Sequence, residues 1–308
     1  MIKGFCNRAP LRYMKRKRQA GMHAYDYLAP AMPGSAVVFA SPHSGRDYPA
    51  GFLAASMLDH RTLRSSEDAF VDHFLRSAPQ AGAPVLTGRV PRAYVDFNRA
   101  ATELDPALIA GISMRGLNPR IASGLGVIPR VVAGGRAIYR GKISRAEASE
   151  RISRYWQPYH DKLTEVMVAQ RQLFGRAILL DMHSMPRDAV SMNGQHTTLR
   201  PDIVLGDRFG AAAHPEIADS VARIFADAGL RVARNSPFAG AYIAQRYGMP
   251  SIGQHAIQIE IDRSLYMDER RVEPSADFAQ FQKLMDMIVP RLARIGDEAA
   301  PALPLAAE

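Results

Sequence analysis

Short apolar stretches rich in β-branched residues alternate along this chain with segments whose apolar residues recur at helical spacing. The strand-like stretches lie at 35–45, 84–90, 93–99, 177–183, 202–207, 230–235 and 255–262. Residues 126–141 indicate a hairpin-like excursion that turns at Gly134 and Gly135. Strands that alternate with helices predict a sheet covered by helices on both faces.

Helical periodicity is most extended after residue 144. Ser144 and Glu147 form the Ser-x-x-Glu pattern of a capping box, so a long helix is expected to begin there and to kink near Pro158. Further helices are expected around 67–78, from 215 to about 229, and through 278–288.

The alternation predicts an α/β fold with a mostly parallel or mixed central sheet, built as one domain from residues 22–295. No internal repeat or linker divides this stretch. The head, residues 1–21, and the tail, residues 296–308, are both expected to be disordered. In open α/β sheets the ligand site lies beyond the carboxyl ends of the strands, so functional side chains are expected there.

Charge changes this picture only at the amino-terminal end. The 308-residue chain has a formal net charge of +9, but residues 1–21 hold seven basic residues and no acidic one. The rest holds 32 basic and 30 acidic residues, so the folded body needs no basic face for nucleic acid. The head is interpreted as a solvated arm. The alternatives are an upstream extension before a true start at Met22, and a targeting or nucleic-acid-binding arm.

Cysteine usage and hydropathy bear on the compartment. Cys6 is the single cysteine and cannot form an internal disulfide, which fits a reducing compartment. No apolar run approaches the roughly 18 residues of a membrane helix, and the head lacks the apolar stretch of a secretory signal. A cytoplasmic protein with no membrane partner is expected.

Two histidines follow predicted strands. His43 lies just past the apolar part of the stretch 35–45, and His183 ends the stretch at 177–183. A single histidine in this setting is most often a hydrogen-bonding loop residue, but two in the same setting support each other as metal ligands. His255 begins its strand on an apolar face and is interpreted as structural.

Carboxylates accompany the histidines. Glu260 shares one strand face with Gln258 and Asp262, and such a polar face indicates either solvent or a cleft. Asp68 and Asp72 would share a face of the helix predicted at 67–78, where ordinary first-turn acids are also favoured. Either Glu67 or Asp68 would supply the oxygen ligand of a His–His–carboxylate zinc site.

Motifs of other chemistries are absent from the sequence. There is no Gly-x-x-x-x-Gly-Lys-Ser/Thr phosphate loop, no Gly-x-Ser-x-Gly nucleophile elbow, no His-Glu-x-x-His helix and no cysteine pair for zinc. The segment Asp-Met-His-Ser lacks the second aspartate of the Asp-x-His-x-Asp pattern of manganese ureohydrolases.

Six segments together resemble the N-formylglutamate amidohydrolase family. They are SPHSGRDYP, SEDAFVD, RAYVDFNRA, GLGVIPRV, ILLDMHSMP and IEIDRSLYMDE, in the family's order from residue 41 to residue 269. Each segment alone is unspecific, but six in order are typical of the family. The resemblance implies a zinc-dependent hydrolase on a phosphorylase/hydrolase-like α/β fold, similar to that of zinc carboxypeptidases. Such an enzyme cleaves N-formyl-L-glutamate to formate and glutamate, a late step of histidine degradation.

The resemblance also implies which residues hold Zn²⁺. By motif position, the ligands are His43, His183 and Asp68, with Glu67 as the rival for the carboxylate. Arg46 stands where the carboxypeptidase-type His-x-x-Glu pattern has its glutamate, so the third ligand departs from that pattern. Independently of the resemblance, Asp181 lies two residues before His183 on the same strand face, where it would orient its neighbourhood through a hydrogen bond.

Catalytic and substrate-binding roles follow from the same resemblance. Glu260 is similar to the family's general base, which would take a proton from water and deliver it to the departing amine. Arg92 would stabilise the oxyanion. Asn98 and Arg99 would hold the substrate, with Arg99 suited to bidentate pairing with a carboxylate.

The expected partner is a small N-acyl amino acid, with no nucleic acid involved and the oligomeric state left open. One alternative is a zinc peptidase or peptide amidase on the same fold. The other is a non-catalytic protein that binds nucleic acid through its basic head.

Overall fold

The computed structural model describes residues 23–113, 118–189 and 200–296. The predicted head and, apart from Gly296, the predicted tail therefore lie outside the described residues. Among the residues that are described, no helix is both long enough and apolar enough to cross a membrane.

A seven-stranded mixed sheet forms the centre of the described chain, with the strand order β1-β3-β2-β6-β9-β7-β8. Its strands are β1 (Tyr25–Leu28), β2 (Val37–Ser41), β3 (Val85–Gly88), β6 (Ala177–Met185), β7 (Ile203–Gly206), β8 (Val232–Arg234) and β9 (Gln254–Asp262). The central strands β3, β2, β6 and β9 are parallel, whereas β1 pairs antiparallel with β3 and β7 antiparallel with β9. The predicted α/β fold with a mostly parallel, mixed sheet is confirmed.

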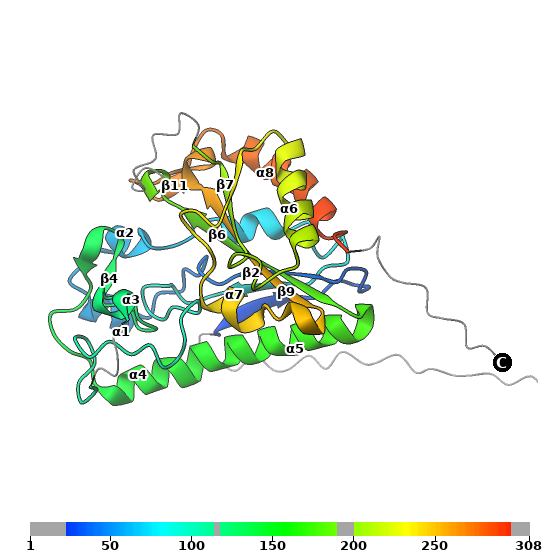
Figure 1. Cartoon of the computed structure of the whole chain (residues 1–308). Helices are drawn as coiled ribbons and strands as arrows, with labels where there is room; N and C mark the ends of the chain where they lie inside the picture. The colour runs from blue at the N-terminus through cyan, green and yellow to red at the C-terminus, as the bar shows by residue number, and fades with distance from the viewer. Residues whose placement is uncertain (1–22, 114–117, 190–199, 297–308) are drawn as a thin grey trace, which may run out of the picture.

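Helices cover both faces of this sheet (Figure 1). The long α5 (Gln157–Phe174) and α7 (Tyr242–Tyr247) lie on one face, and α6 (Pro215–Asp227) and α8 (Phe278–Leu292) on the other. Side chains alternate across a strand, so Val38 joins the apolar cluster of the α5 face while Phe39 joins that of α6 and α8. Full burial of each such side chain contributes about 1.5–3 kcal/mol, so both faces stabilise the sheet.

Shorter elements connect these layers. They are α1 (Ala50–Ala55), α2 (His60–Arg64), η1 (Val71–Leu75), α3 (Pro119–Ala122), β4 (Val131–Val132), η2 (Ala133–Gly135), β5 (Arg136–Ala137), α4 (Arg145–Arg151), η3 (Ile152–Trp156), η5 (Pro250–Ile252), η6 (Arg263–Leu265), β10 (Met267–Asp268) and β11 (Glu273–Pro274). The predicted hairpin is present as the antiparallel pair β4 and β5. Gly134 and Gly135 turn it with φ values of 73° and 72°, which glycine adopts without steric cost.

The long helix predicted from Ser144 is present and contains a π-helical turn. Ser144 caps α4 as expected, because its hydroxyl accepts the backbone N–H of Glu147 at 3.1 Å. α4 passes directly into the π-helical turn η3 and then into α5, which begins just before Pro158. A proline cannot donate the helical hydrogen bond and crowds the preceding turn, and the wider π turn relieves both problems.

The prediction of a helix at 67–78 is wrong for most of this segment. Only the 3₁₀ turn η1 is helical, because Phe70 adopts a left-handed φ of 69°. Asp68 and Asp72 therefore do not share a helix face. Asp68 is buried, whereas Asp72 pairs with the exposed Arg46 at 2.8 Å.

The strand predicted at 93–99 is also wrong, and this segment forms consecutive turns. Asp96 uses Oδ1 to accept the backbone N–H of Asn98 at 2.8 Å, a local bond that competes with strand pairing. One boundary differs as well: β6 continues to Met185, so His183 lies inside the strand.

Candidate active site

The carboxyl ends of β2, β6 and β9 carry the polar residues of the candidate site. In the parallel register of β6 and β9, His183 lies opposite Glu260 and Asp181 lies opposite Gln258. All four side chains are buried, so the sheet holds them at defined positions beside one another. His43 reaches the same edge from the loop after β2.

His43, Asp68 and His183 form the centre of the site. Oδ2 of Asp68 lies 2.9 Å from Nδ1 of His183 and 3.4 Å from Nδ1 of His43. The two imidazole rings meet edge to face, with centroids 4.8 Å apart. One potential ligand atom from each of the three residues lies within 4.8 Å of the other two. The structure thus brings together the three predicted metal ligands from three separate segments of the chain.

A further carboxylate stands behind each histidine. Oδ1 of Asp96 lies 2.8 Å from Nε2 of His43, and Oδ2 of Asp181 lies 2.9 Å from Nε2 of His183. An ionised carboxylate can only accept, so Nε2 of each ring donates to the carboxylate behind it, and Nδ1 of each ring faces Asp68. Carboxylate–histidine pairs orient metal ligands in this way, and a metal ion bound beside Asp68 would take the place of any proton on Nδ1.

Asp68 is held from several directions. Its backbone N–H donates to the carbonyl of His43 at 3.0 Å. Its Oδ1 accepts from the hydroxyl of Ser184 at 3.1 Å and from Arg263 at 3.2 Å. Burial raises the pKa of Asp68, but the hydrogen bond with His183 and the charges of His183 and His43 outweigh it, so the pKa lies well below its usual range. Asp68 is therefore ionised at neutral pH, as a metal ligand must be.

The donors in this cluster fit a divalent metal ion. Nδ1 of His43 is buried and, within the described part of the chain, has no hydrogen-bond partner. Burial lowers the pKa of His183, but Asp181 and Asp68 raise it well above the usual range, so the cluster attracts positive charge at this point. Two imidazole nitrogens and one carboxylate oxygen form the donor set of a catalytic metal site that keeps a position open.

Glu260 lies on β9 beside the cluster and lines the cavity in front of it. Its Oε1 accepts a hydrogen bond of 2.7 Å from the amide of Gln258. Burial raises the pKa of Glu260 and outweighs the charge of His183, which lowers it. A carboxylate with a raised pKa is better matched to proton transfer near neutral pH.

The predicted substrate-binding residues line the same cavity, but their side chains also support the site. Asn98 accepts the backbone N–H of Ile243 at 2.8 Å and donates to Gln258 at 3.3 Å. Nε and Nη1 of Arg99 donate to the backbone carbonyls of Leu125 and Asn98, each at 2.9 Å. These bonds fix the wall of the cavity.

Arg92 also lines the cavity, and its Nε donates to Oδ2 of Asp96 at 2.9 Å. Glu67, the rival ligand, points elsewhere: its carboxylate accepts the hydroxyl of Tyr48 at 2.6 Å and pairs with Arg64. The geometry therefore joins Asp68, and not Glu67, to the two histidines.

Sequence reasoning missed several members of this site. Asp96 and Arg263 lie within segments of the family resemblance but received no role there. Asp96 comes two residues before Asn98, and Arg263 directly follows the end of β9, so placement beside a predicted site residue is the signal that could have found them. Arg263 donates to Ser184 and to the backbone carbonyl of Glu67, which ties β6 and β9 to the segment that carries Asp68.

Ring nitrogens of two residues on η3 and α5 form hydrogen bonds with the backbone of the segment that carries Asn98 and Arg99. Trp156, at the end of the π turn, donates its indole N–H to the carbonyl of Arg99 at 2.9 Å. His160 lies one turn later with Nε2 at 2.8 Å from the carbonyl of Phe97. Burial lowers the pKa of His160 to about 3, so the neutral ring donates from Nε2 and accepts the hydroxyl of Tyr247 at Nδ1.

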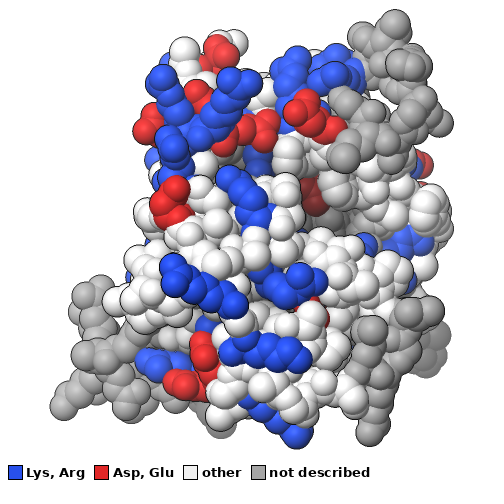
Figure 2. Space-filling model, turned by 90° about the vertical axis from the view of Figure 1, so that its left-hand side faces the viewer, with Lys and Arg blue, Asp and Glu red and all other residues white. Residues whose placement is uncertain are grey.

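A cavity of about 600 Å³ opens in front of the cluster. Its walls include residues of α3, of the β4–β5 hairpin and of the loop 237–241. The first two elements lie on the side of the molecule that Figure 2 faces, where Lys and Arg side chains gather across the middle and acidic ones toward the upper edge. The cavity is within the usual size of small-molecule sites.

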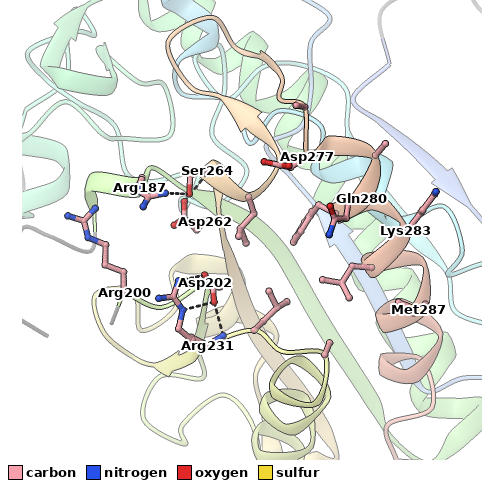
Figure 3. Close-up of a pocket in the computed structure, with 17 residues that line it drawn as sticks. Arg187, Arg200, Asp202, Arg231, Asp262, Ser264, Asp277, Gln280, Lys283 and Met287 are labelled. Atoms are coloured by element: carbon pink, nitrogen blue, oxygen red, sulfur yellow. Dashed lines mark hydrogen bonds and ion pairs between the residues drawn. The ribbon is translucent and has the colours of Figure 1, made fainter. Parts of the chain in front are cut away.

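A second and more open groove of about 1200 Å³ lies between α8 and the region of β7 and β8 (Figure 3). Within it, Arg231 binds Asp202 through two nitrogens, and Arg187 donates to the hydroxyl of Ser264 at 2.8 Å. None of the predicted site residues lines it.

His255 lies at the opposite end of β9 from Glu260. It is buried, and its Nδ1 accepts the backbone N–H of His214 at 3.3 Å. Burial lowers the pKa of His255 to about 4, so the ring is neutral at neutral pH.

The chain is similar in sequence to a known protein family and to named relatives. The family described as N-formylglutamate amidohydrolase matches residues 35–267. An N-formylglutamate deformylase from Pseudomonas aeruginosa is 28% identical over 238 residues, which cover 76% of this chain and 83% of that protein.

Two solved structures share the fold. The crystal structure of an N-formylglutamate amidohydrolase from Ralstonia eutropha superposes with a TM-score of 0.84 at 33% identity, over 90% of this chain and 100% of that one. A gene product of Agrobacterium tumefaciens gives a TM-score of 0.61 at 18% identity, over 87% and 95% of the two chains, and supports the fold alone. Since sequence and fold agree over most of the chain, the protein belongs to the N-formylglutamate amidohydrolase family.

Proposed function

We propose that the protein is a zinc-dependent amidohydrolase that cleaves N-formyl-L-glutamate to formate and L-glutamate. The observation that carries this proposal is the buried group of His43, Asp68 and His183 beside Glu260, at the floor of an arginine-lined cavity. The family relationship supports the substrate, because the similar protein of Pseudomonas aeruginosa is named for deformylation of this compound. A role in histidine degradation belongs to the same proposal.

His43, His183 and Asp68 would hold the metal, with Asp96 and Asp181 orienting the two rings. When bound, zinc supplies Lewis acidity and makes water a competent nucleophile at neutral pH. Two neutral imidazoles and one carboxylate match the donor preference of this ion and leave a position for water.

Glu260 acts as the general base and then as the general acid. It takes a proton from the attacking water and delivers it to the amine that leaves, so that glutamate departs in a stable form. The raised pKa of Glu260 favours the second of these transfers. Arg92, whose charge is beside the cluster, donates to the oxygen that becomes negative on the formyl carbon, and loss of such a donor typically costs about 3 kcal/mol.

Asn98 and Arg99 position the amino-acid part of the substrate. The backbone bonds of Arg99 leave its Nη2 atom without a hydrogen bond to the described residues, so that end of the guanidinium is available to the α-carboxylate. Productive positioning of this kind supplies a large share of the rate of many enzymes.

Metal analysis and a formate-release assay test the proposal. The purified protein is expected to contain about one zinc ion per chain and to release formate from N-formyl-L-glutamate. His183→Ala is expected to lose both properties together, while His255→Gln, at the other end of β9, is the matched control. Full activity after removal of the metal would contradict zinc dependence. Cleavage of short peptides without release of formate would instead favour a peptidase.

A further inference from the structure

The cavity in front of the cluster carries more positive than negative charge. Four arginines line it, whereas Glu260 is the single acidic residue among the described residues that do so. The arginines are Arg92, Arg99, Arg120 and Arg263. A cleft with this balance attracts and retains anionic ligands.

Three of these arginines are engaged with the protein. Arg263 donates from Nε, Nη1 and Nη2 to Ser184 and to two backbone carbonyls. Arg92 is bound to Asp96, and Arg99 to two backbone carbonyls. Their guanidinium groups are therefore restricted in what else they can bind.

Arg120 differs from the other three. Its backbone N–H donates a hydrogen bond of 3.0 Å to Oδ1 of Asn118. Arg120 lines the cavity, and its guanidinium group has no hydrogen bond or ion pair to any described residue. Its charge also helps to lower the pKa of the buried Arg99, after the larger effect of burial, so the two cations lie close enough to repel. An anion between them would relieve this repulsion.

We propose that Arg120 selects substrates that carry a second carboxylate, by binding the side-chain carboxylate of an N-acyl acidic amino acid. This inference rests on the function proposed above, in which Arg99 holds the α-carboxylate. The planar fork of Arg120 suits bidentate pairing with a carboxylate, and two arginines match the two charges of a dicarboxylate. Preference for glutamate over a neutral amino acid would then come from α3, outside the catalytic cluster.

The neighbouring Arg208 provides a matched control. It lines a smaller adjoining cavity of about 340 Å³ together with Arg120, but it does not line the cavity of the cluster. Removing the charge of Arg208 changes the electrostatic field near Arg120 but leaves the proposed contact between Arg120 and the carboxylate in place.

The test compares N-formyl-L-glutamate with N-formyl-L-glutamine, which has the same shape without the second charge. Arg120→Met is expected to lower kcat/KM for the glutamate compound about 10- to 100-fold, mainly through KM, as the loss of a charged hydrogen bond predicts. The value for the glutamine compound should change less than about threefold on the same reasoning. Arg120→Lys should retain part of the preference, and Arg208→Met should retain all of it.

Equal losses on both substrates, or no loss on either, would overturn the proposal. If the wild-type protein releases formate from neither compound, the proposed function itself fails. In that case, calorimetric measurement of glutarate binding still tests whether Arg120 binds a carboxylate. Weaker binding to Arg120→Met than to the wild type and Arg208→Met supports it, and equal binding to all three overturns it.

Discussion

Burial raises the pKa of both Glu260 and Asp68, but the two carboxylates end with pKa values on opposite sides of the usual range. Glu260 is buried with its pKa raised, whereas Asp68, equally buried, has a pKa well below its usual range because two histidines face it. Two carboxylates in one site therefore suit different tasks, proton transfer for Glu260 and metal ligation for Asp68.

Glu260→Gln tests this separation. The amide keeps the size of the side chain but cannot accept the proton, so turnover should fall at least about 100-fold while the metal content stays unchanged. Formate release and metal analysis on the same sample check both expectations. Asp72→Asn is the control, because that carboxylate lies at the surface beside Arg46. Normal turnover in the Glu260 variant would assign the base role to another group.

His160 gives a prediction about stability and pH. Its pKa is about 3 in the folded protein, mainly through burial, and about 6.5 in an unfolded chain. Between these pH values the unfolded state binds more protons. The free energy of unfolding should therefore fall as the pH drops from about 6.5, by up to about 1.4 kcal/mol per pH unit for this group.

The measurement is urea unfolding of wild type and His160→Gln at several pH values between 7.5 and 5. Both proteins are treated with chelator first, so that release of metal does not contribute to the pH dependence. We expect a shallower dependence for the variant. An identical slope in both proteins would contradict a neutral, buried His160.

At the scale of elements, the site depends on loops that approach one another closely at the ends of β2 and β3. Gly45, two residues after His43, passes so near the chain that a Cβ there would lie 2.2 Å from the carbonyl oxygen of Val90. Gly88 ends β3 in a similar way, because its Cβ would lie 2.3 Å from the carbonyl oxygen of Pro42. These contacts are with backbone atoms, so the loops cannot make room by rotating a side chain.

Gly45→Ala should therefore displace the loop that carries His43. We expect a loss of about 1–3 kcal/mol in stability, as for other overpacked positions, together with weaker metal binding. Gly51→Ala is the control: a Cβ there meets nothing within 4 Å, and alanine should stabilise α1 slightly. Urea unfolding and metal titration of both variants check this, and wild-type metal affinity in Gly45→Ala would contradict it.

At the scale of the whole molecule, charge is divided unevenly between the head and the body. Residues 1–21 hold seven of the 39 basic residues and no acidic residue. The described residues that form the candidate site all lie between 43 and 263, so none of them belongs to the head.

Deletion of residues 1–21 should leave kcat/KM for N-formyl-L-glutamate within about twofold of the full chain, because every residue assigned to the candidate site lies between 43 and 263. Any weak, salt-sensitive binding of DNA by the full chain should disappear with the deletion. Formate release and gel shifts at low salt measure the two properties. DNA binding that persists in the truncated protein would locate it on the folded body.

The sequence alone determined the sheet, most of its strands and the identity of the metal-binding candidates. The reason is that these signals are local. An apolar run of strand length predicts a strand, and the polar residues that follow it mark where that strand ends at the edge of the sheet. The hairpin at Gly134 and Gly135 and the cap at Ser144 were equally readable, because glycine conformation and capping depend on a few adjacent residues.

Only the tertiary structure placed Asp68 beside the two histidines and turned Glu67 toward Tyr48 and Arg64. It also revealed Asp96 and Arg263 as supports of the cluster and left Arg120 as the arginine of the cavity without a partner among the described residues. Such roles depend on distances between segments far apart in the chain. No local pattern encodes those distances, because they are set by how β2, β6 and β9 pack side by side.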